Sequence, residues 1–290
     1  MRVAVGQVSL QVGDLEGNRA RSTDAILAAV ADGADLVVLP ELSDSGYVFA
    51  STEEASSLGA PILGNPTLQR WSELANQHRI TIAGGFSELG EDGALYNSAA
   101  LIAPDQNPLT YRKVHLWDGE KEFFTPGDAL STVTEINGVR VGLAICYDLE
   151  FPELVRALAI MGVELLVVPT NWPLSPFPQA ERPMEFVKAQ ASAATNGIWI
   201  AIADRCGKER GVDWVGYSSL LDPSGYPTFA PIPFGVAGVA VGEVDPARAR
   251  NKMISSKNHL LDDRRSDLYR VIARSVSTAQ VWDNGDPPPW

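Results

Sequence analysis

Residues 139–161, VRVGLAICYDLEFPELVRALAIM, contain a strand pattern, a cysteine and a helix pattern in direct succession. The mainly apolar run over residues 139–145 predicts a buried strand. Helical spacing follows over residues 151–161, where Pro152 suits the first turn of a helix. Cys146 therefore lies on a short connection near helix N-terminal N–H groups, which can lower the pKa of a thiol and stabilise an oxyanion.

Short apolar, β-branched runs alternate with helical patterns along most of the chain. Runs this apolar are buried on both faces, which predicts an α/β fold with helical layers on a central β core. We expect one domain over residues 1–270, because no low-complexity linker divides it, and an extended arm over residues 271–290, which end in DPPPW. The predicted strands are residues 3–10, 36–39, 80–86, 96–103, 110–114, 139–145, 165–168, 198–203, 218–221 and 236–241, and the predicted helices are residues 17–33, 68–78, 151–161 and 180–195.

Composition excludes several classes of protein. The 290 residues include 23 lysines and arginines and 36 aspartates and glutamates, a formal net charge of −13, so neither nucleic acid nor an anionic membrane is expected as a partner. The first residues lack a secretory-signal pattern and no apolar run reaches ~20 residues, which predicts a cytoplasmic protein. Cys146, Cys206 and three scattered histidines form neither a disulfide framework nor a metal-ligand cluster, so no metal or other cofactor is expected.

Glu41, Lys113 and Cys146 each stand at the end of a predicted strand. The carboxyl ends of strands in α/β sheets converge on one crevice, which predicts that the three side chains meet. No histidine is obviously placed as a base, so Glu41 is the candidate to accept the thiol proton and Lys113 the candidate to stabilise thiolate and oxyanion. Taken singly, each residue also fits an ordinary role: a core cysteine, a capping or surface carboxylate, and a solvated lysine.

Three motifs in this order resemble the nitrilase superfamily, the carbon-nitrogen hydrolases. They are VVLPELSDSGY over residues 37–47, YRKVHL over residues 111–116 and GLAICYDLEFPEL over residues 142–154. The resemblance extends over residues 1–270, and the segments ICYDLEFPE and FTPGD, the latter at residues 124–128, are similar to the amidase-like branch. It implies a four-layer α-β-β-α sandwich that forms a homodimer by packing one helical layer against its twin.

The resemblance also implies roles for individual residues. Glu41, Lys113 and Cys146 match a catalytic triad of glutamate, lysine and cysteine. A second glutamate of the family helps to place the substrate, and Glu120 matches it better than Glu122 because Glu120 is followed by Lys121, as in the family's usual pair. The aromatic residues beside the motifs are expected either to wall the substrate pocket or to pack in the core; they are Tyr147, Trp172 and Phe123.

The expected activity is hydrolysis of small aliphatic primary amides through a thioester on Cys146, with nitriles as poor substrates. Nitrilase, ω-amidase, N-carbamoyl amino acid hydrolase and acyltransferase are the alternatives within the superfamily. A carbamoyl amino acid would need a cation to hold its carboxylate, for which Arg182 or Arg205 is a candidate. Outside the superfamily, the alternatives are a catalytically inactive dimeric interaction module and a thiol peroxidase or redox sensor.

Thr195 differs from the family pattern, and Cys206 is expected to lie outside the site. The helix before residues 198–203 usually ends in Ala-x-Glu-Asn, but here Thr195 replaces the glutamate, so substrate-side or structural contacts made there should differ. Cys206 also follows a predicted strand, yet it lacks a matched acid and lysine motif. We therefore expect Cys206 to be structural.

Overall fold

The computed structural model describes residues 1–178, 181–269 and 272. Its centre is an eleven-stranded mixed sheet in the order β5-β4-β3-β2-β1-β9-β8-β7-β6, with β12 beside β9 and β13 beside β1. A short separate ribbon pairs β10 (Lys208–Glu209) with β11 (Val212–Asp213). The strands of the large sheet are β1 (Arg2–Ser9), β2 (Leu36–Val38), β3 (Thr81–Leu89), β4 (Leu95–Ile102), β5 (Leu109–Arg112), β6 (Thr134–Ile136), β7 (Val139–Leu143), β8 (Leu165–Thr170), β9 (Trp199–Cys206), β12 (Ser219–Leu221) and β13 (Gly238–Glu243).

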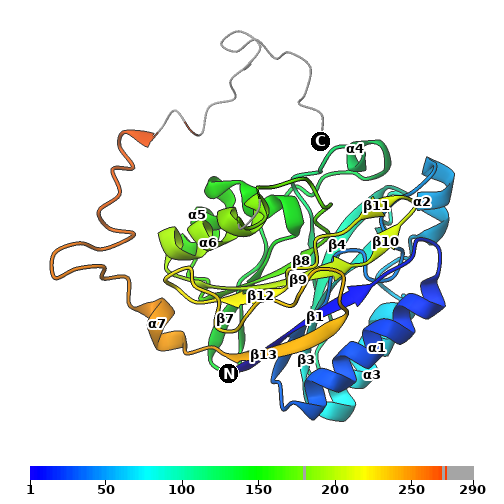
Figure 1. Cartoon of the computed structure of the whole chain (residues 1–290), viewed down its shortest axis with the longest axis horizontal. Helices are drawn as coiled ribbons and strands as arrows, with labels where there is room; N and C mark the ends of the chain where they lie inside the picture. The colour runs from blue at the N-terminus through cyan, green and yellow to red at the C-terminus, as the bar shows by residue number, and fades with distance from the viewer. Residues whose placement is uncertain (179–180, 270–271, 273–290) are drawn as a thin grey trace, which may run out of the picture.

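Helices connect the strands and cover the outer faces of the sheet (Figure 1). Local sequence explains several of their starts: the Asp14 and Asn65 side chains cap the first turns of α1 and α3, and Pro152 occupies the first turn of α5 as predicted. Cys146 begins a 3₁₀ helix, η1 (Cys146–Glu150). The α-helices are α1 (Leu15–Ala31), α2 (Thr52–Leu58), α3 (Pro66–His78), α4 (Glu120–Phe123), α5 (Pro152–Ile160), α6 (Met184–Asn196) and α7 (Pro246–Arg250).

The sheet curls so that its two halves pack face to face. Successive strand side chains point to opposite faces. In β1, Val3 and Val5 join the core shared with β7, β8 and β9, whereas Ala4 and Val8 join the core beneath α1 and α3. Helices α5 and α6 cover the other half, so the layers run helix, sheet, sheet, helix (Figure 1). This arrangement confirms the predicted α/β fold with a four-layer α-β-β-α sandwich.

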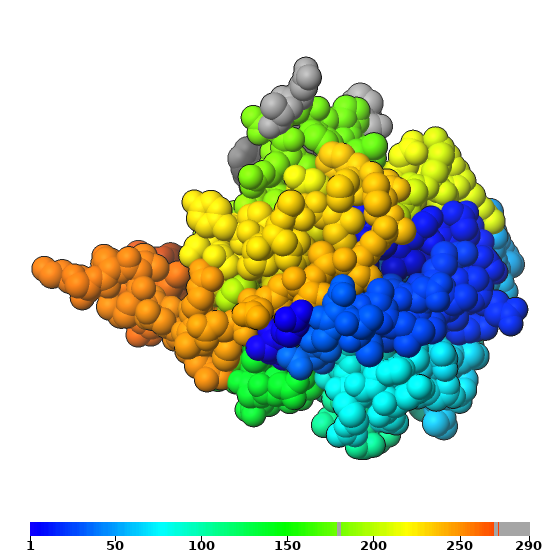
Figure 2. All heavy atoms as spheres, turned by 60° about the horizontal axis from the view of Figure 1, so that its bottom comes forward, coloured from blue at the N-terminus to red at the C-terminus, as the bar shows by residue number. Residues whose placement is uncertain are grey.

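The structure corrects some element bounds. The predicted helix over residues 180–195 begins only at Met184, because Pro183 has an extended backbone with ψ of 136° and residues 181–182 are not helical. Helix α2 and strand β6 were not predicted, since each is too short for a clear periodic pattern. The described residues after α7, orange in Figure 2, project from the packed body.

Two expectations on organisation, the C-terminal arm and the homodimer, remain predictions. The arm over residues 271–290 lies outside the described residues, apart from Ile272. No helix in the described ranges is long and apolar enough to cross a membrane. The homodimer stays a prediction, and it is supported by apolar side chains that are exposed on and beside α5 and α6: Ile160, Met161, Met184 and Val187.

Candidate active site

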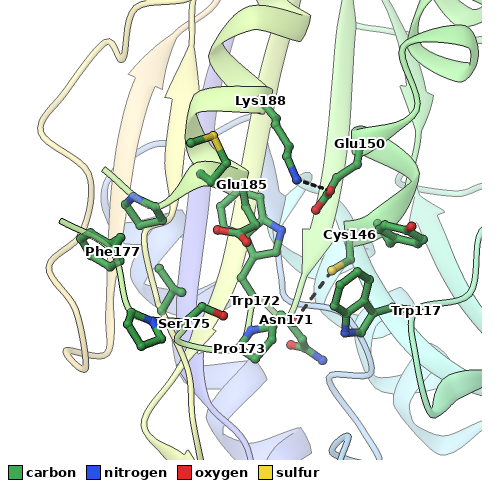
Figure 3. A pocket seen from close by; sticks show the side chains of 15 residues that line it. Trp117, Cys146, Glu150, Asn171, Trp172, Pro173, Ser175, Phe177, Glu185 and Lys188 are labelled. Carbon is green, nitrogen blue, oxygen red and sulfur yellow. Dashed lines mark hydrogen bonds and ion pairs between the residues drawn. The ribbon is translucent and has the colours of Figure 1, made fainter. Parts of the chain in front are cut away.

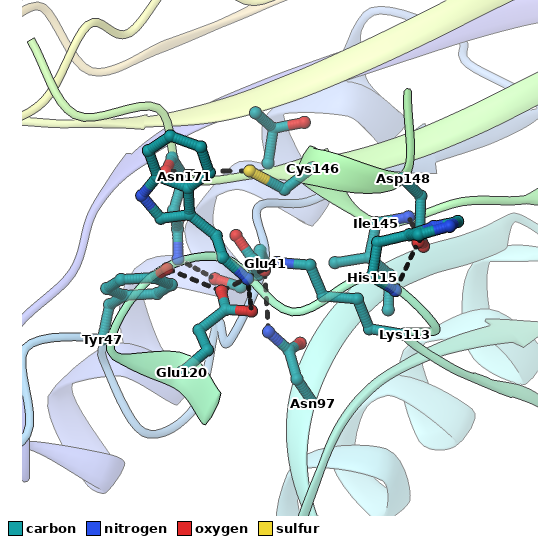
Figure 4. A network of polar contacts seen from close by, with 12 residues as sticks. Glu41, Tyr47, Asn97, Lys113, His115, Glu120, Ile145, Cys146, Asp148 and Asn171 are labelled. Carbon is teal, nitrogen blue, oxygen red and sulfur yellow. Dashed lines mark hydrogen bonds and ion pairs between the residues drawn. The ribbon is translucent and has the colours of Figure 1, made fainter. Parts of the chain in front are cut away.

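Glu41, Lys113 and Cys146 come together at one end of the curled sheet (Figure 4). Each lies a few residues beyond a strand: Glu41 beyond β2, Lys113 directly after β5, and Cys146 beyond β7. All three side chains are buried. The backbone of β3 approaches Glu41 so closely that a Cβ at Gly85 would lie 2.5 Å from the Glu41 Cα, so this position requires glycine.

Cys146 has a left-handed backbone, with φ of 46°. Such a conformation costs about 1–3 kcal/mol in a non-glycine residue and persists where neighbouring groups fix it. Here Asp148 provides this restraint, because its carboxylate accepts hydrogen bonds from the Ile145 N–H at 3.1 Å, the His115 N–H at 3.0 Å and the Tyr111 hydroxyl at 2.8 Å. Asp148 therefore joins the turn that carries the cysteine to the segment that carries Lys113.

The Lys113 ammonium lies between two carboxylates. Its Nζ donates to Oε1 of Glu41 at 2.6 Å and to Oε1 of Glu120 at 2.7 Å. Glu120 is itself held by the Tyr47 hydroxyl at 2.6 Å and by the Trp117 N–H at 3.0 Å. The structure thus brings the predicted second glutamate, Glu120, into contact with the predicted lysine.

Hydrogen bonds leave one oxygen of Glu41 available. Asn97 donates to Oε1 of Glu41 at 2.7 Å, the same oxygen that Lys113 contacts. Oε2 of Glu41 is buried and accepts no hydrogen bond within the described part of the chain. The Cys146 Sγ lies 3.8 Å from the carbonyl oxygen of Asn171, whose side-chain amide donates to the Glu41 carbonyl at 3.0 Å. Glu41 therefore has an unoccupied acceptor in the cluster that contains the thiol.

Burial and neighbouring charges set the protonation states. Burial raises the pKa of Glu41 to about 7, although the positive charge of Lys113 opposes the shift. Burial, together with the negative charge of Glu41, raises the pKa of the Cys146 thiol well above its usual value. Burial lowers the pKa of Lys113, but the carboxylates of Glu120 and Glu41 more than offset this and raise it. The resting cluster therefore combines a neutral thiol, a cationic lysine and a carboxylate that can accept a proton near neutral pH.

A cavity of about 470 Å³ opens beside Cys146. Tyr147 and Trp172 line it, as predicted, and Trp117 contributes a further aromatic wall. Phe123 does not line this cavity: it lies in a neighbouring hollow of about 250 Å³ and packs edge-on against Phe49, with ring centroids 5.6 Å apart. Glu120 and Trp117 line the same hollow as Phe123, so the role of Phe123 in the wall of the substrate pocket stays a prediction.

Comparison with known proteins identifies the family. A family model described as carbon-nitrogen hydrolase matches residues 2–252. The chain belongs to the carbon-nitrogen hydrolase family. This hydrolase is 34% identical to a nitrilase from Pyrococcus abyssi, over 93% of its own chain and 99% of the relative. It is 36% identical to an (R)-stereoselective amidase from Pseudomonas sp, over 78% of each chain.

Solved structures agree with this assignment. An amidase from Nesterenkonia sp. AN1 is similar to this hydrolase with a TM-score of 0.76 and 28% identity, over 94% of this chain and 99% of that chain. In that structure acrylamide has added to the active-site cysteine. The protein is thus an enzyme of the nitrilase superfamily that acts on carbon–nitrogen bonds.

The hydrolase has three charged residues in its cavity that the motifs did not indicate as substrate contacts: Glu150, Glu185 and Lys188. Glu150 could have been found from sequence, because it stands four residues after Cys146 on the same short turn. Glu185 and Lys188 are spaced by three residues on α6, the spacing that places side chains on one helix face. Which face meets the cavity depends on the path of the preceding loop, for which the sequence carries no signal.

The other predicted or doubtful positions lie elsewhere. Arg205 is buried and donates to Glu209 at 2.9 and 3.1 Å, while Arg182 donates to Gln190 at 2.7 Å; neither lines the cavity of the hydrolase. The candidate cation in the cavity is therefore Lys188. Thr195 is exposed on α6 and does not line the cavity either.

The pH profile of the hydrolase should show an acidic limb near pH 7. The Glu41 carboxylate, with a pKa of about 7, can accept a proton only above that pH, so kcat/KM should fall about tenfold per pH unit below it. The measurement is kcat/KM between pH 5 and 9 on an amide substrate. A flat profile from pH 5 to 8 would mean that no group with this pKa takes part.

Proposed function

We propose that this hydrolase is an amidase that converts small aliphatic primary amides to carboxylate and ammonia through a thioester on Cys146. The observation that carries the proposal is the buried Glu41–Lys113–Glu120 cluster next to a cysteine that opens into a cavity. An (R)-stereoselective amidase among its relatives, and the amidase among the solved structures, support an amide over other substrates.

The proposed reaction begins at the thiol. Glu41 takes the Cys146 proton as the sulfur attacks the amide carbon, and the carbonyl π electrons move to the oxygen. When the tetrahedral intermediate collapses, Glu41 gives that proton to the nitrogen, the carbon–nitrogen bond breaks and ammonia leaves. Glu41 then takes a proton from water, which attacks the thioester, and returns it to the sulfur as the carboxylic acid departs.

Lys113 is suited to hold the oxyanion. An ammonium has three N–H donors, of which two point to Glu41 and Glu120. The third donor remains for the substrate oxygen, and the backbone N–H of Tyr147 supplies the second contact in this proposal. Loss of one such donor typically costs about 100- to 1000-fold in rate.

Glu120 favours an amide over a nitrile in this mechanism. Its carboxylate accepts three hydrogen bonds, from Lys113, Tyr47 and the Trp117 N–H, and a carboxylate can accept about four. The remaining site is available for the NH₂ group of an amide. A nitrile has no N–H to donate, so this acceptor would stay unpaired at a cost of about 1–3 kcal/mol.

The substrate assignment predicts a clear order of kcat/KM. The kcat/KM of acetamide, propionamide and butyramide should each exceed that of the matching nitrile by at least about tenfold, because a nitrile leaves an acceptor site of Glu120 unpaired. Ammonia release is the readout, and the panel includes an α-ketoglutaramate-type amide and an N-carbamoyl amino acid. The assignment fails if the nitriles are better substrates, or if either of these last two compounds exceeds the simple amides more than tenfold. Nitriles are a specific alternative substrate class, because the Pyrococcus abyssi relative is named a nitrilase.

A further inference from the structure

The cavity beside Cys146 is lined by charged side chains that do not belong to the buried Glu41–Lys113–Glu120 cluster. Glu150, Glu185 and Lys188 reach into the hollow that contains the cysteine (Figure 3). Glu150 comes from η1, and the other two come from the first turns of α6. Two carboxylates and one ammonium give this part of the cavity one net negative charge.

Two of these three charged side chains pair with each other, and the third does not. The Lys188 Nζ forms an ion pair with the Glu150 carboxylate. Glu185 has neither a hydrogen bond nor an ion pair from its side chain to any residue that the structure describes, although it is only partly exposed. The cation of the cavity is thus already engaged, and the carboxylate of Glu185 is left to meet a ligand.

The size of the cavity leaves room for a substrate larger than acetamide. About 470 Å³ falls within the range of roughly 300–1,000 Å³ that is typical of pockets for drug-sized ligands. An amide with only four heavy atoms would leave most of this volume to water. The apolar wall provided by Trp172, Phe177 and Val215 suits a short hydrocarbon chain between the reacting amide and the charged residues.

We infer that the preferred amide carries a positively charged ammonium group on its acyl chain, and that Glu185 is the specificity-determining residue that binds it. This inference rests on the proposed amidase function. A carboxylate with no partner of its own favours a cationic ligand group, whereas an anionic group would have to displace Glu150 from Lys188. The net charge of −13 over the whole chain acts in the same direction, because it attracts cationic substrates.

The test compares amides that differ only in the end of the chain. Hexanamide ends in a methyl group, 5-aminopentanamide has an ammonium in its place, and the monoamide of glutaric acid ends in a carboxylate. Wild-type enzyme should show kcat/KM for 5-aminopentanamide about tenfold above that for hexanamide, the effect of one charge-assisted contact in a partly exposed site. Glu185→Gln should bring this ratio close to one, and Glu185→Lys should favour the anionic amide.

Glu153→Gln is the matched control. Glu153 is exposed in the first turn of α5, outside the cavity that contains Cys146, and its replacement changes the net charge by the same amount. It should keep the wild-type ratio. Thermal unfolding followed by circular dichroism shows that each variant is folded.

Two results would overturn the inference. One is a wild-type enzyme that does not distinguish 5-aminopentanamide from hexanamide. The other is a preference for the anionic amide that disappears in Lys188→Met, which would make Lys188 the recognition residue. If only nitriles are hydrolysed, the amidase proposal is wrong, and the ratio between 5-aminopentanenitrile and hexanenitrile then tests Glu185 in the same way.

Discussion

Cys146→Ala is expected to lower kcat for amide hydrolysis by roughly 10⁴- to 10⁶-fold, the scale seen when a catalytic nucleophile is removed. The thiol is the only group in the proposed mechanism that forms a covalent bond to the substrate. Alanine removes a single buried sulfur, so the fold should persist, held by the Asp148 contacts to Ile145 and His115. Ammonia release at saturating substrate is the measurement.

Cys206→Ala is the control for this variant. Cys206 is also buried, at the end of β9, and burial raises the pKa of its thiol to about 11. Among the residues that the structure describes, no glutamate–lysine pair lies beside it, so its loss should leave turnover near the wild-type rate. Full ammonia release by folded Cys146→Ala, or inactivation by Cys206→Ala alone, would contradict the proposed nucleophile.

Glu41→Gln is expected to lower kcat/KM about 10²- to 10⁴-fold, the usual contribution of a general base. Glutamine has nearly the shape of glutamate, and its side-chain oxygen can still accept from Lys113 and Asn97, as Oε1 of Glu41 does. It cannot take the thiol proton. The rate should therefore fall without loss of the fold, and the acidic limb near pH 7 should disappear with it.

Glu164→Gln provides the comparison for this second variant. Glu164 is also buried, and its carboxylate forms ion pairs with Arg140 and Arg250 rather than with the lysine of the active-site cluster. The substitution should lower thermal stability while leaving kcat/KM close to wild type. A Glu41→Gln enzyme as active as Glu164→Gln would exclude Glu41 as the base.

The fold was predictable because most of its strands are apolar and are separated by clear helical patterns. The meeting of Glu41, Lys113 and Cys146 was predictable for a related reason: each stands close to the end of a strand, so the sheet alone fixes where it lies. The catalytic roles of these three residues came from the family motifs, because the hydrophobic periodicity of the sequence predicts position but not chemistry. Glu120 depended on the same motifs, since a four-residue helix leaves no periodic signal.

The outer cavity was not predictable on these grounds. Glu185 and Lys188 reach it only because α6 begins after Pro183 and packs with one particular face toward η1. Phe123 adjoins the motif residues in sequence, but α4 turns its ring toward Phe49, and it lines the neighbouring hollow with Glu120 rather than the cavity beside Cys146. Adjacency in sequence predicts position well along a strand and poorly in a short helix or loop, where one residue changes the direction of the side chain.

In the proposed mechanism, Cys146 carries the acyl group between the two halves of the reaction. Wild-type enzyme mixed with butyramide and quenched in acid on the millisecond scale can be digested and its peptides analysed by mass spectrometry. We expect a butyryl thioester on Cys146 that forms with the first release of ammonia and decays as butyrate appears. Ammonia release with an acyl group on Cys206 or on another residue, and none on Cys146, would contradict it.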